Sequence, residues 1–288
     1  MKKIIKRTLL IIALVLTAGI IYIFTYVPPL SKQHGVVETL LYLGDSDNQP
    51  LIVAFGGSEG GIDWHRNHMK SKRDSLIQKG YAILAIGYFN ADGTQRILDR
   101  ISLDAISDTI MHIAKNNNKI DHSNIALIGG SKGGELILNL ASRFKQYKAV
   151  IAMSTSNVSF PAHTWSANTS SWTYKNKEVP YVPASFETIS PALKGNHYAA
   201  FSMMLEDKAA VKNVEIQVEN INGPILILSG KDDDQWPATL MSNRIIERLK
   251  ENDFKYYKEH IMLNGGHIEP LKQFNLVYDF LEKYLPAK

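Results

Sequence analysis

Ten residues near the middle of the chain restrict its fold more than any other segment. Residues 125–134 read Ile-Ala-Leu-Ile-Gly-Gly-Ser-Lys-Gly-Gly, so a continuous apolar run leads directly into a serine among glycines. The spacing Gly129-x-Ser131-x-Gly133, after an expected strand and before an expected helix, is the context that a nucleophile elbow requires. Glycines are needed there because a sharp strand-to-helix turn strains the backbone and brings chain segments close together. The pattern predicts that Ser131 is a nucleophile at the carboxyl edge of a sheet and at a helix N-terminus.

Two other interpretations of this turn fit less well. A phosphate-binding loop needs Gly-Lys-Ser/Thr, whereas Lys132 follows Ser131 here. An ordinary tight turn would not need a buried strand on one side and a helix on the other. The nucleophile interpretation therefore stands first.

The rest of the sequence alternates short apolar runs with helical patterns, which is typical of a mostly parallel sheet with crossover helices. The middle runs are continuously apolar, as expected for strands covered on both faces. Expected strands are 36–42, 51–55, 81–86, 124–128, 148–153, 225–229 and 256–262. Expected helices are 68–79, 103–116, 133–144, 238–250 and 269–284. The sequence thus predicts an α/β fold, with a mostly parallel central sheet flanked by helices.

Residues 155–222 interrupt this rhythm. They are rich in Ser, Trp, Tyr and Pro, and a structureless loop of that length is rare inside a compact domain. We therefore expect an inserted lid. Its aromatic side chains would either line an apolar wall for a substrate or pack the insertion onto the body.

The order of the remaining polar residues suggests partners for the serine. In an α/β-hydrolase the acid follows the nucleophile and the histidine comes last. His267 lies after the last strand and before the last helix, and Asp233 stands three residues after the glycine that ends strand 225–229. Asp232 and Asp234 remain lower-ranked alternatives for the acid, since either could instead cap the following helix.

Two backbone N–H groups are expected to stabilise the oxyanion. One belongs to Lys132, which follows the nucleophile, and the other to Ser58 or Gly57 in the glycine-rich loop after strand 51–55. No metal or other cofactor is expected. The chain has no cysteine, and His65 and His68 lack a third ligand nearby in the sequence.

The N-terminal segment predicts a membrane association. Residues 9–27 carry no charge, and the four basic residues in 2–7 account for the whole net charge of +4. An uncleaved single-pass anchor is favoured over a cleaved signal peptide because the apolar run is long and tyrosines follow it. Basic residues stay cytoplasmic, so the catalytic domain should lie on the extracytoplasmic side, or be secreted if the segment is cleaved. The predicted division is an anchor at 1–29 and a catalytic domain at 30–288, with no basic face for nucleic acid.

Five motifs together resemble one family. They are FGGSEGG (55–61), GYAILAIGYFN (80–90), IALIGGSKGGELILNLASRF (125–144), ILILSGKDDDQWPA (225–238) and GGHIEP (265–270). The set is similar to the acyl-CoA thioester hydrolase and bile acid-CoA:amino acid N-acyltransferase family. The resemblance implies an α/β-hydrolase fold with a triad at Ser131, Asp233 and His267. It also implies hydrolysis of a small acyl thioester or ester, since a serine nucleophile accompanies hydrolysis in this family and cysteine accompanies transfer.

Two alternatives stay open at this point. The same triad could serve an extracytoplasmic carboxylesterase, a dienelactone-type hydrolase or a peptidase. A catalytically silent binding protein on the same fold is the third hypothesis.

Overall fold

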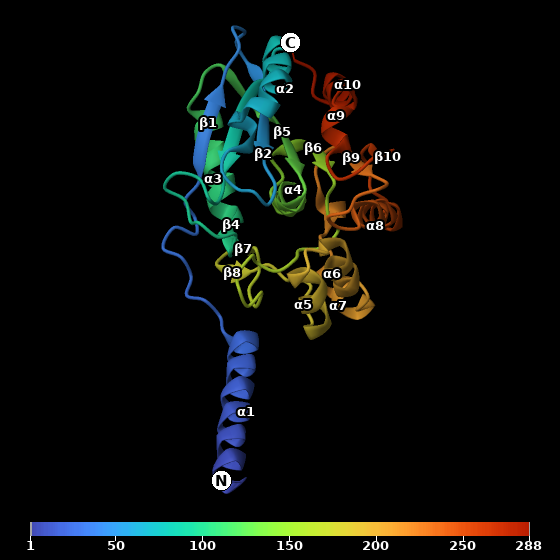
Figure 1. Cartoon of the computed structure of the whole chain (residues 1–288). Helices are drawn as coiled ribbons and strands as arrows, with labels where there is room; N and C mark the ends of the chain where they lie inside the picture. Colours follow the sequence, from blue (N-terminus) through green and yellow to red (C-terminus); the bar gives the residue numbers. More distant parts are fainter. Residues whose placement is uncertain (1, 288) are drawn as a thin grey trace.

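A computed structural model describes residues 2–287, and its body is built around one large sheet (Figure 1). Within those residues the sheet has seven strands in the order β1-β3-β2-β5-β6-β9-β10. Its strands are β1 (Glu38–Tyr42), β2 (Gln49–Phe55), β3 (Ala82–Gly87), β5 (Ile120–Gly130), β6 (Tyr147–Met153), β9 (Ile225–Gly230) and β10 (Lys258–Leu263). β1 runs antiparallel to β3, and the other neighbours are parallel. The predicted mostly parallel α/β fold is confirmed, and each expected strand is present.

Helices cover both faces of this sheet. They are α2 (Asn67–Gln78), α3 (Leu103–Lys115), α4 (Lys132–Arg143), α8 (Ala238–Glu251), α9 (Glu269–Lys272) and α10 (Asn275–Tyr284). Apolar side chains of α3, α4 and α8 pack on one face, and those of α2 and α10 pack on the other. Along β2, Leu51 and Val53 enter the first core and Ile52 and Ala54 the second, because successive side chains of a strand alternate in direction. Burial on both faces explains the continuous apolar runs in the sequence.

The single helix expected over 269–284 is wrong, since α9 ends before α10 begins. Between them the chain turns at Gln273 (φ −98°, ψ 40°). The turn allows Phe274 to bury its ring against Trp64, with the centroids 6.1 Å apart, while α9 stays beside β9. Packing in the second core has therefore overridden a continuous helical pattern.

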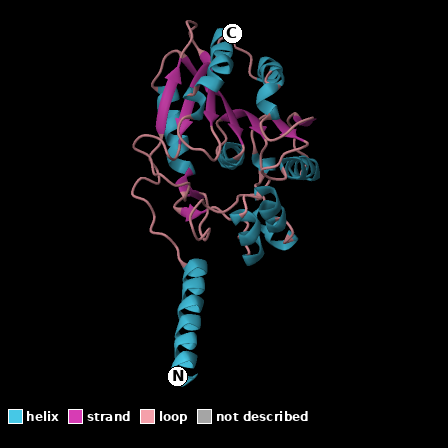
Figure 2. Cartoon of the chain, viewed as in Figure 1, coloured by secondary structure: helices cyan, strands magenta, loops and turns pink. Residues whose placement is uncertain are grey.

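The insertion at 155–222 is largely structured. It contains α5 (Ile189–Leu193), α6 (His197–Met204) and α7 (Lys208–Val214), which gather at one end of the body (Figure 2). It also contains β7 (Trp172–Tyr174) and β8 (Lys177–Glu178), which join β4 (Ile101–Ser102) in a second sheet. None of these short elements was expected from the sequence.

Helix α1 (Lys2–Thr25) projects from the body on the side where the insertion lies (Figure 1). Its segment Lys3–Ile23 is long and apolar enough to cross a membrane, and a signal sequence would satisfy the same criteria. The chain leaving α1 contacts the body, where Arg100 Nη2 donates to the Pro28 carbonyl at 2.7 Å.

Candidate active site

Ser131 stands between β5 and α4 in a strained backbone conformation. Its φ of 55° and ψ of −122° are rare for a residue with a side chain. A Cβ at Gly129 would lie 2.4 Å from the Gly133 carbonyl oxygen, and a Cβ at Gly133 would lie 2.3 Å from that of Gly56. Both glycines are therefore required by close approach of the backbone, as the motif suggested.

His267 and Asp233 are hydrogen-bonded to each other. Nδ1 of His267 lies 2.7 Å from Oδ2 of Asp233, whose side chain is almost fully buried. The other carboxylate oxygen accepts from the backbone N–H groups of Gln235 (2.9 Å) and Trp236 (3.3 Å). Asp232 and Asp234 are exposed, and in the described chain neither is bonded to His267. The carboxylate with the first-ranked spacing is thus the one beside the imidazole.

Close backbone contact brings the aspartate and histidine loops together. A Cβ at Gly230 would lie 2.2 Å from the Gly266 carbonyl oxygen. Ser154, directly after β6, donates from Oγ to the His267 carbonyl at 2.7 Å. The Ser154 carbonyl accepts from the Trp236 indole at 2.9 Å. Sequence reasoning missed Ser154, although its place at the carboxyl end of a central strand was a usable signal.

Ser131 and His267 face the same space. Both line a cavity of about 940 Å³ and a second of about 640 Å³. Among residues 2–287, no hydrogen bond joins the serine hydroxyl to the imidazole. Such bonds are often long in unliganded sites and shorten when substrate binds.

The loop after β2 presents its N–H groups in a fixed direction. The Tyr88 hydroxyl contacts the carbonyl oxygens of Gly56 (2.9 Å) and Gly57 (3.2 Å). Because C=O and N–H point in opposite directions across a trans peptide, the N–H groups of Gly57 and Ser58 point away from Tyr88. Gly57 also lies beside Ser131, since a Cβ at Gly57 would be 3.2 Å from the Ser131 Cβ. The Lys132 N–H lies in the first turn of α4, where backbone N–H groups lack partners within the helix, so these three groups stay the expected donors.

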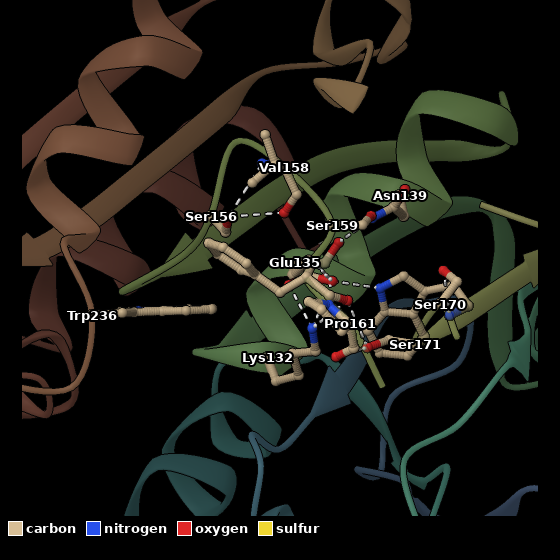
Figure 3. A network of polar contacts seen from close by, with 12 residues as sticks. Lys132, Glu135, Asn139, Ser156, Val158, Ser159, Pro161, Ser170, Ser171 and Trp236 are labelled. Atoms are coloured by element: carbon tan, nitrogen blue, oxygen red, sulfur yellow. Dashed lines mark hydrogen bonds and ion pairs between the residues drawn. The ribbon is translucent and has the colours of Figure 1, made fainter. Parts of the chain in front are cut away.

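The Lys132 side chain belongs to a buried polar network at the start of α4 (Figure 3). Its Nζ lies 2.8 Å from Oε2 of Glu135, while Oε1 of Glu135 accepts from the Trp172 indole at 2.7 Å. Burial raises the pKa of Glu135 and lowers that of Lys132, and the attraction between them opposes both effects. Nζ also contacts the Phe160 carbonyl at 3.3 Å. The network thereby bonds the first turn of α4 to the insertion, a role that the sequence did not reveal.

The two cavities differ in chemistry. The larger one is walled mainly by apolar residues of the insertion, among them Phe160, Phe201 and Met204. His163 also lines it, and its side chain is exposed there. The smaller cavity lies toward α2 and α9 and carries Arg66, Lys72 and Lys272. Apolar side chains such as Trp64, Met69 and Leu271 also line the smaller cavity, so the two cavities differ mainly in these cationic groups.

His65 and His68, the two histidines weighed for a metal site, have other partners. Nδ1 of His65 bonds to the Tyr42 hydroxyl at 2.7 Å, and Nε2 of His68 pairs with Asp63 at 3.2 Å. Each of these two imidazoles therefore bonds to a different residue.

Comparison with known proteins adds sequence evidence. The profile of the family described as BAAT / Acyl-CoA thioester hydrolase C terminal matches residues 108–271. Mitochondrial acyl-coenzyme A thioesterase 2 of Homo sapiens is 25% identical over 228 residues, which are 77% of this chain and 43% of that protein. Acyl-coenzyme A thioesterase 1 of Rattus norvegicus is 26% identical over 243 residues, 83% of this chain and 53% of that protein. The chain spans about half the length of these relatives.

Solved structures agree on the fold. An acylaminoacyl peptidase of Pyrococcus horikoshii superposes with a TM-score of 0.61 at 17% identity, covering 87% of this chain and 40% of that one. Acetyl xylan esterase 1 of Thermoanaerobacterium superposes with a TM-score of 0.55 at 14% identity, covering 86% of this chain and 79% of that one.

Proposed function

Because the chain belongs to the BAAT / acyl-CoA thioester hydrolase family, we propose that it is a serine hydrolase that cleaves acyl thioesters. The observation that carries the proposal is the bonded pair His267–Asp233, which shares a cavity with the strained Ser131. The named activity of the relatives, acyl-coenzyme A thioester hydrolysis, supports the thioester as substrate.

The proposed reaction has two halves. Ser131 Oγ attacks the acyl carbon while Nε2 of His267 takes its proton, and Asp233 stabilises the imidazolium. The oxyanion lies against the N–H groups of Lys132 and Ser58, with Gly57 as the alternative donor. When the C–S bond breaks, the thiolate receives the proton from His267. Water, deprotonated by the same ring, then attacks the acyl carbon. The bond from that carbon to Ser131 Oγ breaks, Oγ takes the proton back from His267, and the acid is released.

The wider assignments follow from the same proposal. Residues 1–29 would form a single-pass anchor, and 30–288 an extracytoplasmic catalytic domain with a lid at 155–222. The substrate is a small molecule, and the proposed mechanism uses no metal or other cofactor.

Steady-state rates of the full chain test the proposal. We expect turnover of long-chain acyl-CoA well above that of p-nitrophenyl acetate, and no turnover by Ser131→Ala. A fluorophosphonate probe should label the wild type and not Ser131→Ala. Acyl-CoA turnover at background, with ester turnover retained, would favour a carboxylesterase or a related hydrolase. No labelling of the wild type would favour a silent binding protein.

A further inference from the structure

Large apolar side chains are exposed on the outside of the insertion. Trp165 is 86% exposed, Phe186 65% and Leu193 80%, and none of the three lines the larger cavity. We call these three residues the insertion face. The other tryptophans, at positions 64, 172 and 236, are at most 3% exposed. Tryptophan is highly buried on average and is enriched where an apolar region meets water, so the exposed Trp165 is the most informative of the three.

The insertion face begins where α1 ends. Asn168, three residues after Trp165, reaches the carbonyl oxygens of Ile23 (3.4 Å) and Tyr26 (3.3 Å). Ile23 is the last residue of the segment that could cross a membrane. Trp165 is therefore at the level of the membrane–water interface once that segment spans a bilayer, and tryptophan is enriched at this level.

The same stretches of chain form the wall of the larger cavity. His163 and Ala167 line the cavity on either side of Trp165, and Ala192 lines it next to Leu193. A thin layer of chain thus separates the apolar cavity from the insertion face. A molecule crossing from a lipid leaflet into the cavity would not need to pass through bulk water.

We propose that the insertion face docks on the bilayer leaflet in which α1 ends, and that the acyl substrate enters the cavity from that leaflet. The inference rests on the proposed function and the proposed anchor, and it adds the substrate class. The substrate is an acyl ester or thioester whose chain partitions into lipid. Docking places the cavity wall against the acyl chains of the lipids. The acyl chain of the substrate can then enter the cavity directly from the leaflet, which brings the substrate carbonyl group to Ser131.

Tryptophan fluorescence tests the docking step without any catalysis. The full chain is reconstituted in phosphatidylcholine vesicles containing lipids brominated on the acyl chains. Since α1 contains no tryptophan and the other three indoles are buried, the quenched emission should come from Trp165. We expect bromolipid to quench this emission and aqueous iodide to leave it largely unaffected. Trp165→Phe should abolish the difference. Emission that is quenched by iodide and not by bromolipid would overturn the proposal.

Kinetics test the route of the substrate. The double variant Trp165→Ser/Leu193→Ser should lower hydrolysis of a long-chain acyl ester dissolved in vesicles by about tenfold, because interfacial binding depends on buried apolar area. Its rate on water-soluble p-nitrophenyl acetate should be unchanged. The matched control is Leu43→Ser. Leu43 is an exposed leucine directly after the edge strand β1, and its substitution should change neither rate.

The outcomes separate this inference from the proposed function. Equal loss on both substrates would contradict entry from the leaflet. Quenching of Trp165 in a chain that hydrolyses neither substrate would support docking and reject the chemistry. Turnover without quenching would support the chemistry and reject docking.

Discussion

At the scale of single residues, the adjacent carboxylates of Asp232, Asp233 and Asp234 differ in burial: Asp233 is buried beside His267, and the other two are exposed. Asp233→Asn should lower kcat by about 10⁴, because the amide favours the wrong tautomer of His267. Asp234→Asn is the matched control at an exposed neighbour and should leave kcat nearly unchanged. Steady-state kinetics of both variants would measure this, and similar losses would contradict the assignment of the acid.

Tyr88 orients the loop that carries two expected oxyanion donors. Burial raises the pKa of Tyr88 well above its usual value, so its hydroxyl is protonated and can donate to the loop carbonyls. Tyr88→Phe should lower kcat by about tenfold with little change in KM, because misdirected N–H groups weaken binding of the transition state most. Tyr147→Phe removes another buried hydroxyl, which contacts Ser107 at 3.1 Å, and should leave kcat unchanged. A rise in KM at constant kcat in Tyr88→Phe would refute this positioning role.

His260 should make the fold sensitive to acid. Its ring contacts Ser229 (2.7 Å) and Asn243 (2.9 Å), and burial lowers its pKa from 6.5 to about 4. Between these values the unfolded state holds more protons, so the free energy of unfolding falls as the pH drops from 6.5 to 4. In His260→Gln the free energy of unfolding should therefore fall by about 1 kcal/mol less over this pH range than in the wild type. This value is reduced because the ring is partly exposed. Urea denaturation at several pH values would measure it, with exposed His122→Gln as the control.

At the scale of elements, the first turn of α4 depends on the buried pair Lys132–Glu135. Glu135→Gln should destabilise the fold by about 3–5 kcal/mol, because it leaves a buried ammonium without its carboxylate. The double variant Lys132→Met/Glu135→Gln removes that charge while the new amide oxygen can still accept from Trp172, so most of the stability should return. Chemical denaturation of both variants would show this. A double variant as unstable as the single one would mean that the pair itself stabilises the fold.

Elements whose sequence pattern is local could be predicted best. The central strands were predictable because burial on both faces demands continuous apolar residues. The pairing of β4 with β7 was not, because each is only a few residues long and its partner lies about seventy positions away. In the site, chain order and spacing pointed to Ser131, Asp233 and His267. Tyr88 and Glu135 were missed because their roles depend on contacts with residues distant in the sequence.

At the scale of the whole molecule, the position of α1 leads to a prediction about membrane attachment. We expect the purified chain to retain residues 1–29 by mass and to remain in the membrane fraction after alkaline washing, since about twenty apolar residues can span a bilayer. A phosphatase fused to the C-terminus should be active on the extracytoplasmic side. A shortened mass and release into solution would instead mean that the segment is cleaved as a signal peptide.

The contact between the chain after α1 and the body also affects how the enzyme moves. The Arg100 guanidinium donates to the Pro28 carbonyl, and the Ser102 N–H donates to the His34 carbonyl at 3.0 Å. These two hydrogen bonds hold the segment between α1 and β1 against the body. Under the proposed anchoring, we expect these bonds to limit the tilt of the body relative to the bilayer and to confine its search for substrate to lateral diffusion in two dimensions.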